Sequence, residues 1–204
     1  MADPTLEEQI ASAGLTYRRR HDISYRAGLV AQVLGAAVLA VLYPLGSPFY
    51  TLGIMLFNAG ALLSGIYLLV WISWVKKIIL GSILIGITLQ VLGSMYASEQ
   101  YAVSVILVGI GLVCVGAGGV VGKEAYCFAY REGWALVWLY PVLILANLIG
   151  MSHPVFNALG FSAAFLLLLS LTGKKLKQPL LSKCTTGVCA PPTGQQTADD
   201  QTPD

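Results

Sequence analysis

The run AVSVILVGIGLVCVGAGGVVG, residues 102–122, decides the fold class of this chain. It contains no charged residue, and a helix needs about 20 mostly apolar residues at about 1.5 Å each to cross roughly 30 Å of hydrocarbon. A strand of a membrane barrel would instead alternate apolar and polar positions over about ten residues. The run therefore predicts a transmembrane helix.

The rest of the chain has the composition of a membrane protein. Of its 204 residues, 56% are hydrophobic and 11% are charged, and the mean hydropathy is +0.74. Soluble domains carry about 25% charged residues. The 22 charged residues gather at the two ends, with eight in residues 1–26 and seven in residues 173–204. This pattern excludes a soluble globule, a disordered chain and a nucleic-acid-binding protein.

Charges, prolines and polar clusters divide the middle of the chain into six apolar segments. We therefore predict an all-α, polytopic membrane helix bundle with six transmembrane helices, at residues 27–43, 49–70, 78–97, 102–122, 134–150 and 155–172. Every connector is short, so no soluble domain is inserted. We expect residues 1–26 to be an amphipathic and basic leader and residues 173–204 to be a basic segment followed by a disordered tail.

The basic residues predict the orientation, because Lys and Arg beside the membrane stay on the cytoplasmic side. With six spans, all twelve fall on one side: Arg18, Arg19, Arg20, Arg26, Lys76, Lys77, Lys123, Arg131, Lys174, Lys175, Lys177 and Lys183. The opposite connectors, 44–48, 98–101 and 151–154, contain no Lys or Arg. Both termini are therefore predicted inside. An odd number of spans would divide the basic residues between the two faces.

Small residues predict where helices approach closely, because lipid removes the usual hydrophobic drive between helices. The fourth span contains Gly111, Gly118 and Gly122, and the last two form a G-x-x-x-G pair. The third span adds Gly86 and Gly93. We expect these glycines to pack the third and fourth spans at the centre of the bundle. Backbone exposed to a small ligand or pigment is the alternative.

Amide side chains are candidates for a polar path across the membrane. Asn58, Gln90 and Asn147 lie within predicted spans, whereas Asp, Glu, Lys and Arg are absent from them. Ion-coupled transport relies on buried ionisable groups, so this absence argues against that class. The amides either line a path for a small neutral solute or hydrogen-bond between helices, and we favour the hydrogen bonds.

The most distinctive stretch is the connector GKEAYCFAYREGW, residues 122–134. If it is helical, Lys123, Cys127 and Arg131 share a face at steps of four. Two cations beside a thiol favour the reactive thiolate, which makes Cys127 a candidate catalytic residue. We favour a simpler interpretation, an interfacial connector whose aromatic rings lie among the headgroups while Lys and Arg extend towards water.

The other cysteines give little support for metal or redox chemistry. Cys184 and Cys189 are separated by four residues, not by the two typical of zinc knuckles and thioredoxin-like motifs. With Cys127 and His21 they are candidate zinc ligands, but no spacing fixes their geometry. Cys127 and both tail cysteines fall on the predicted cytoplasmic side, where structural disulfides are rare. We predict no metal and no cofactor.

At the connector the chain is similar to a family of uncharacterised integral membrane proteins, best known from cyanobacteria and classed as a domain of unknown function. The residues that carry the resemblance are GKEAYCF followed by REG after a glycine-rich span, together with the six-span layout. It covers roughly residues 20–175. It implies a bacterial plasma or thylakoid membrane location, with no established activity, substrate or cofactor and no functional residue to carry over.

Three functions follow from these patterns. The first is a nonenzymatic scaffold or assembly helper that packs against other membrane proteins in the lipid bilayer. The second is a channel or facilitator for a small neutral solute, lined by Asn58, Gln90 and Asn147. The third is a thiol enzyme using Cys127. We favour the first, because the helix faces are rich in small residues, the connectors are short and the spans lack ionisable groups.

Overall fold

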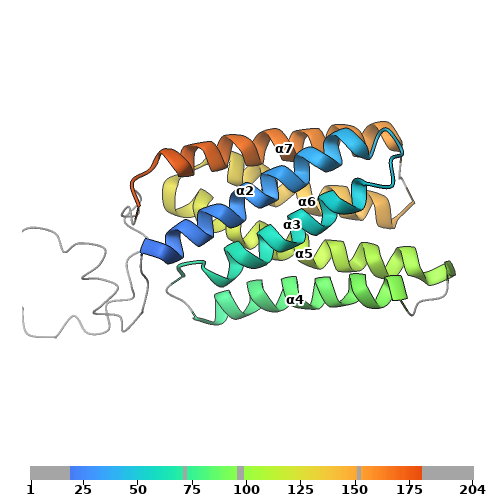
Figure 1. Cartoon of the computed structure of the whole chain (residues 1–204), viewed down its shortest axis with the longest axis horizontal. Coiled ribbons are helices and arrows are strands. Elements are labelled where there is room, and N and C mark those ends of the chain that lie inside the picture. The colour runs from blue at the N-terminus through green and yellow to red at the C-terminus, as the bar shows by residue number, and fades with distance from the viewer. Residues whose placement is uncertain (1–18, 71–72, 96–98, 151–152, 181–204) are drawn as a thin grey trace, which may run out of the picture.

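A computed structural model describes residues 19–70, 73–95, 99–150 and 153–180, which form six helices and no strand. The helices are α2 (Arg19–Leu42), α3 (Tyr50–Ile66), α4 (Ser73–Met95), α5 (Glu99–Phe128), α6 (Arg131–Leu148) and α7 (Pro154–Lys177). They run alternately up and down in one bundle (Figure 1). The predicted all-α class is confirmed. Residues 1–18 of the predicted leader and 181–204 of the predicted tail lie outside the described residues, whereas residues 19–26 of the leader form the start of α2.

Four of the described helices are long and apolar enough to cross a membrane: Arg19–Leu42, Ser73–Met95, Tyr101–Phe128 and Pro154–Lys177. The other two are shorter, since α3 has 17 residues and α6 has 18. At about 1.5 Å per residue they measure about 26 and 27 Å, slightly less than a hydrocarbon core of about 30 Å. Six membrane crossings therefore remain a prediction for this bundle of six helices.

The helices differ from the predicted spans mainly at the end of the bundle that carries the basic residues. There α5 continues past residue 122 to Phe128, and α7 continues past residue 172 to Lys177. At the same end α4 is also longer than predicted, because it begins at Ser73 and not at residue 78. In contrast, α3 is shorter and ends at Ile66, not at residue 70. The predicted spans stop at charged residues, but α5 continues through Glu124 and α7 continues through Lys175, and these two side chains pair with each other.

The connector between α5 and α6 is only Ala129 and Tyr130. Ala129 has a φ of 55°, in the left-handed region, where residues other than glycine are uncommon. Just beyond it, Gly133 brings the two helices together, because a Cβ there would lie 2.7 Å from the carbonyl oxygen of Val121. The long connector expected over residues 122–134 is therefore a tight turn between two helices.

The pair α2 and α3 is held close by glycines on both helices. A Cβ on Gly28 would lie 2.8 Å from the carbonyl oxygen of Gly60, and a Cβ on Gly35 would lie 2.7 Å from that of Gly53. Side chains at these positions would push the backbones apart. Glycine therefore permits a backbone-to-backbone contact that dispersion forces and interhelical hydrogen bonds can then stabilise.

The pair α4 and α5 makes the same kind of contact. A Cβ on Gly86 would lie 2.5 Å from the carbonyl oxygen of Gly109, and a Cβ on Gly109 would lie 2.6 Å from that of Gly86. Nearer the end of α4, a Cβ on Gly93 would lie 2.9 Å from a side-chain carbon of Ile106. These distances explain why the third and fourth predicted spans pair along their length.

The apolar core lies between the helices, and α4 is at its edge. Fully buried side chains come from several helices, including Leu29 of α2, Ile83 of α4, Leu136 of α6 and Leu168 of α7. Among the four long apolar helices, α4 has the smallest buried share, because it packs only on α5 and α3. Its position at the edge of the bundle is visible in Figure 1.

The basic residues gather at one end of the bundle. The start of α2, the end of α7 and the turn between α5 and α6 all lie at that end (Figure 1). The described Lys and Arg residues occupy these helix ends and the first turns of α4: Arg19, Arg20, Arg26, Lys76, Lys77, Lys123, Arg131, Lys174, Lys175 and Lys177. We call this the basic end. Its assignment to the cytoplasm remains a prediction.

Candidate functional site

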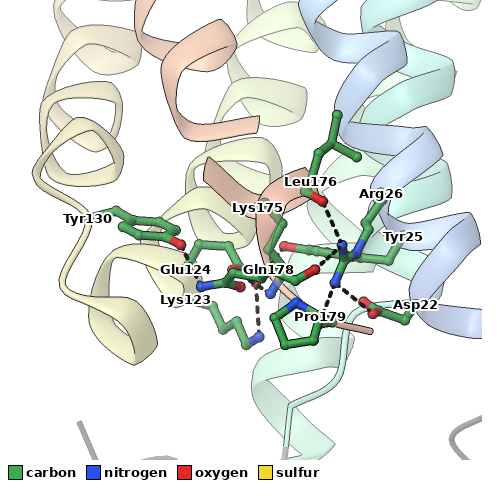
Figure 2. A network of polar contacts seen from close by, with 10 residues as sticks. All are labelled: Asp22, Tyr25, Arg26, Lys123, Glu124, Tyr130, Lys175, Leu176, Gln178 and Pro179. Carbon is green, nitrogen blue, oxygen red and sulfur yellow. Dashed lines mark hydrogen bonds and ion pairs between the residues drawn. The ribbon is translucent and has the colours of Figure 1, made fainter. Parts of the chain in front are cut away.

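A buried carboxylate, Glu124, lies at the centre of a polar network at the basic end (Figure 2). Its side chain is fully buried, and its two oxygens contact three other side chains. Oε1 accepts a hydrogen bond from the Tyr25 hydroxyl at 2.8 Å and lies 2.9 Å from Lys123 Nζ. Oε2 forms an ion pair with Lys175 Nζ at 2.9 Å. Glu124 therefore joins α2, α5 and α7.

Aromatic rings complete the surroundings of the two lysines. Lys175 Nζ lies 4.2 Å from the centre of the Phe128 ring and 5.8 Å from that of Tyr25. Lys123 Nζ lies 5.5 Å and 5.9 Å from the same two rings. A ring face attracts a cation most strongly where water is excluded. The rings therefore help to compensate the burial of the two ammonium groups.

A second part of the network fastens the end of α7 to α2. The Arg26 guanidinium forms an ion pair with Asp22 at 3.0 Å. It also donates to the carbonyl oxygens of Gln178 at 2.8 Å, Pro179 at 2.9 Å and Leu176 at 3.4 Å. These carbonyls belong to the end of α7 and the residues after it, where the helix leaves acceptors without intrahelical partners. Arg26 thus acts as a cap supplied by another helix.

The turn after α5 is tied to the same network. The Gln178 side chain donates to the Tyr130 hydroxyl at 2.5 Å. Burial raises the pKa of the Tyr130 phenol, and the negative charge of Glu124 raises it further. Nearby, a hydrogen bond from Lys174 lowers the pKa of the Glu132 carboxyl, which also accepts a bond from Ser170. Tyr130 remains a neutral phenol and Glu132 an ionised carboxylate at neutral pH.

This network was not visible as a motif in the sequence. Tyr25 and Glu124 are 99 residues apart, and Lys175 follows Glu124 on a different helix. Only the Asp22–Arg26 pair has a local signal, because side chains four residues apart share a helix face. Chemically, both oxygens of Glu124 are already occupied and the side chain has no access to solvent. The network is therefore suited to holding helices together rather than to proton transfer.

The amides of the predicted polar path are paired with other side chains. Asn58 donates to Gln90 at 2.8 Å and connects α3 to α4. Asn147 and Asn157 exchange two bonds, of 2.8 and 2.9 Å, and connect α6 to α7. Gln32, on α2, donates to a serine of α3 at 2.9 Å. These contacts are interhelical hydrogen bonds: Asn58 and Gln90 pair with each other, whereas Asn147 pairs with Asn157, so the three candidate path residues do not form one cluster.

The proposed thiol site differs from its expected geometry. Cys127 is 4% exposed and disulfide-bonded. The expectation that Cys127 is a reduced thiol is therefore wrong. That expectation rests on the predicted cytoplasmic location, where disulfides are rare. Lys123 contacts Glu124, and Arg131 begins the next helix after the Ala129 turn. Lys123 and Cys127 lie four residues apart on α5 and share a face as expected, but Arg131 belongs to α6, so the three side chains do not share one helix face.

The predicted zinc ligands are only partly described. Cys184 and Cys189 lie outside the described residues. His21 stacks on Tyr67, with ring centres 5.5 Å apart. Within residues 19–70, 73–95, 99–150 and 153–180, no group of three or more His, Cys, Asp or Glu side chains is placed to hold a metal ion.

An apolar groove of about 670 Å³ runs between α5 and α6. Its lining includes Gly111, Gly118 and Gly122 of α5 and Trp134, Val137 and Ile144 of α6. A Cβ on Gly118 would meet only a ring carbon of Tyr140, at 3.9 Å, and a Cβ on Gly122 only Val137, at 3.4 Å. The G-x-x-x-G pair expected in a tight helix contact thus opens onto the groove. Gly111 is closer to its neighbour, with Ile144 at 3.0 Å from a Cβ.

A helix bundle with a largely apolar outer surface defines an integral membrane protein. The chain belongs to a family described as uncharacterised integral membrane proteins, DUF2301, whose match covers residues 62–184. The match confirms the membrane location and the resemblance to a domain of unknown function, while the link to cyanobacteria and the choice between membranes remain predictions. Comparison with curated proteins and with solved structures gives no match.

Proposed function

We propose that this protein is a nonenzymatic scaffold or assembly helper that packs against other membrane proteins. The observation that carries the proposal is the apolar outer face of α4, which no other described helix covers. Its exposed residues follow one side of the helix: Trp74, Ile78, Leu84, Ile85, Val91, Leu92 and Met95. The pairing of the amides also supports the scaffold. Asn58 is bonded from α3 to α4 and Asn147 from α6 to α7, so these amides hold helices together and do not line a path for a solute.

A notch in this face would let another helix approach. Gly81 lies between Ile78 and Leu84, and a Cβ built on it meets no atom within 4 Å. Helix pairs in membranes use such small residues to bring backbones together. Gly81 and its exposed neighbours therefore form the surface that we assign to a partner's transmembrane helix.

The first prediction tests this surface by purification from native membranes in mild detergent. We expect the wild type to retain a partner in a fixed ratio and Gly81→Leu to lose it, because the added side chain fills the notch. The matched control is Gly173→Leu, since Gly173 is also helical and open, on α7. Mass spectrometry of the purified complex measures the ratio. Equal retention by Gly81→Leu and the wild type would contradict the assignment of α4.

The same preparation separates the scaffold from its alternatives. A lone monomer that conducts a neutral solute in liposomes, with flux lost on Asn58→Leu, would replace the scaffold by a facilitator. A phenotype abolished by Cys127→Ser with the partner still bound would favour thiol chemistry. The fixed partner ratio, without flux, is the result that the scaffold requires.

The second prediction concerns orientation, which we propose has the basic end and both termini in the cytoplasm. A reporter that is active only outside the cytoplasm should be active when fused after Ser47 or Glu99, because their connectors contain no Lys or Arg. It should be inactive after Lys77 or at the C-terminus. Reporter activity in cells is the measurement, and the reversed pattern would overturn the orientation.

A further inference from the structure

We propose that the α5–α6 groove holds an acyl chain of an anionic phospholipid whose phosphate pairs with Arg131. This site lies on α5 and α6, whereas the surface assigned to a protein partner lies on α4. The two proposals can therefore fail independently.

The groove has the shape and lining of an acyl-chain site. Along α5 its lining extends from Val108 to Gly122, which is about 21 Å at about 1.5 Å per residue. Half of a hydrocarbon core of roughly 30 Å is shorter than this, so a chain that starts at the basic end can reach the bilayer centre inside the groove. Water is a poor occupant, because a buried water needs two to four polar partners.

The end of the groove near the basic end has the groups that recognise a phospholipid headgroup. Trp134 lines the groove there and is half exposed, as is typical of residues at the headgroup level. Arg131 lies three residues earlier on α6, so it extends the groove-lining side of the helix by one turn. Arg131 is exposed and makes no hydrogen bond or ion pair with any residue that the structure describes.

The charges around Arg131 favour an anionic lipid over a neutral one. The adjacent carboxylate, Glu132, is already bonded to Lys174 and Ser170. Lys123 is likewise bonded to Glu124. Arg131 therefore has an uncompensated positive charge at the mouth of the groove, and guanidinium binds phosphate in a bidentate way. A zwitterionic headgroup would bring its own cation to the same place.

The third prediction measures lipid binding to the full-length protein in detergent by native mass spectrometry. Phosphatidylglycerol and phosphatidylcholine with identical acyl chains are the two probes. We expect one phosphatidylglycerol to bind about tenfold more tightly than phosphatidylcholine, because both lipids offer a phosphate to Arg131 but only the choline headgroup adds a cation that repels it. Arg131→Gln should reduce this preference to about twofold or less. Lys77→Gln, at an exposed basic residue of α4, should leave it unchanged.

Two further arms test the groove itself. Val115→Trp should weaken the binding of both lipids, because Val115 lines the groove and is 58% exposed; Val115→Phe is the milder replacement if the tryptophan variant does not fold. Glycerol phosphate, which has the headgroup chemistry but no acyl chain, should not displace the lipid. Equal affinity of the wild type for the two lipids, or a preference that survives Arg131→Gln, would overturn the proposal, as would unchanged binding to a folded groove variant.

Discussion

Glu124→Gln should lower the free energy of unfolding by about 3–5 kcal/mol, the usual effect of removing one member of a buried ion pair. The cause is the lysine left behind. The Lys175 side chain is 6% exposed, so its ammonium group would remain buried without a counter-charge. Lys123, at 22% exposure, can turn towards water. Thermal or chemical unfolding in detergent measures the loss.

Two matched variants show whether charge is responsible. The double variant Glu124→Gln with Lys175→Met removes both charges and should recover most of the lost stability, because replacing a buried pair by neutral groups is often nearly neutral. Glu132→Gln breaks an ion pair whose lysine is 48% exposed, and should cost less than about 1 kcal/mol. A double variant no more stable than Glu124→Gln would indicate that shape, not charge, is essential.

The Glu132 pair also has a defined pH dependence. Its carboxyl pKa is lowered by the hydrogen bond from Lys174. The stability that it contributes is therefore present above the ordinary pKa of a glutamate and is lost as the pH falls through the lowered value. Glu132→Gln removes this dependence, which makes the control informative below pH 5 as well as at neutral pH.

Gly86→Leu should prevent α4 and α5 from packing and should also cost several kcal/mol. Even a Cβ at this position would lie 2.5 Å from the carbonyl oxygen of Gly109, and the backbone cannot move aside as a flexible side chain can. Overpacking a tight contact costs about 1–3 kcal/mol and sometimes more. Loss of stability in detergent, together with loss of the Asn58–Gln90 bond, is the expected result.

Gly118→Ala is the control. It adds a methyl group to a glycine of α5, the helix that packs against α4. Its Cβ would lie 3.9 Å from Tyr140, an ordinary van der Waals distance, so stability should change little. If Gly118→Ala were as damaging as Gly86→Leu, the groove between α5 and α6 would have to be closed in the folded protein. Unfolding curves of the two variants, measured side by side, decide this.

The class of the fold could be predicted from hydropathy, but the ends of the helices could not. A charge-free run such as residues 102–122 can only be accommodated as a helix in lipid. The continuation of α5 through Glu124 depends on Tyr25 and Lys175, which come from other helices. The turn at Ala129 has no sequence signal either, because alanine is neither glycine nor proline and ordinarily favours a helix.

The role of each glycine at the candidate sites could not be predicted from the sequence either. Gly86, Gly109 and Gly118 look alike in the sequence, yet two of them touch a neighbouring backbone and the third opens onto a groove. The difference depends on how each helix is rotated about its axis, and an apolar helix surrounded by lipid has no polar face to reveal that rotation. The sequence could predict that amides such as Asn58 and Gln90 form hydrogen bonds between helices. Which amide bonds to which could be known only from the three-dimensional structure.

The attachment of Arg26 to the end of α7 also sets an order for biosynthesis. Its carbonyl acceptors are 150 to 153 residues further along the chain, which ribosomes synthesise in roughly 8 to 30 seconds at about 5–20 residues per second. During that interval Asp22, on the same helix, can hold the charge of Arg26 alone. Of the described helices α7 is made last, and it completes the attachment of α2, the first of them; a chain that stops before α7 leaves Arg26 without these carbonyl acceptors and Glu124 without Lys175.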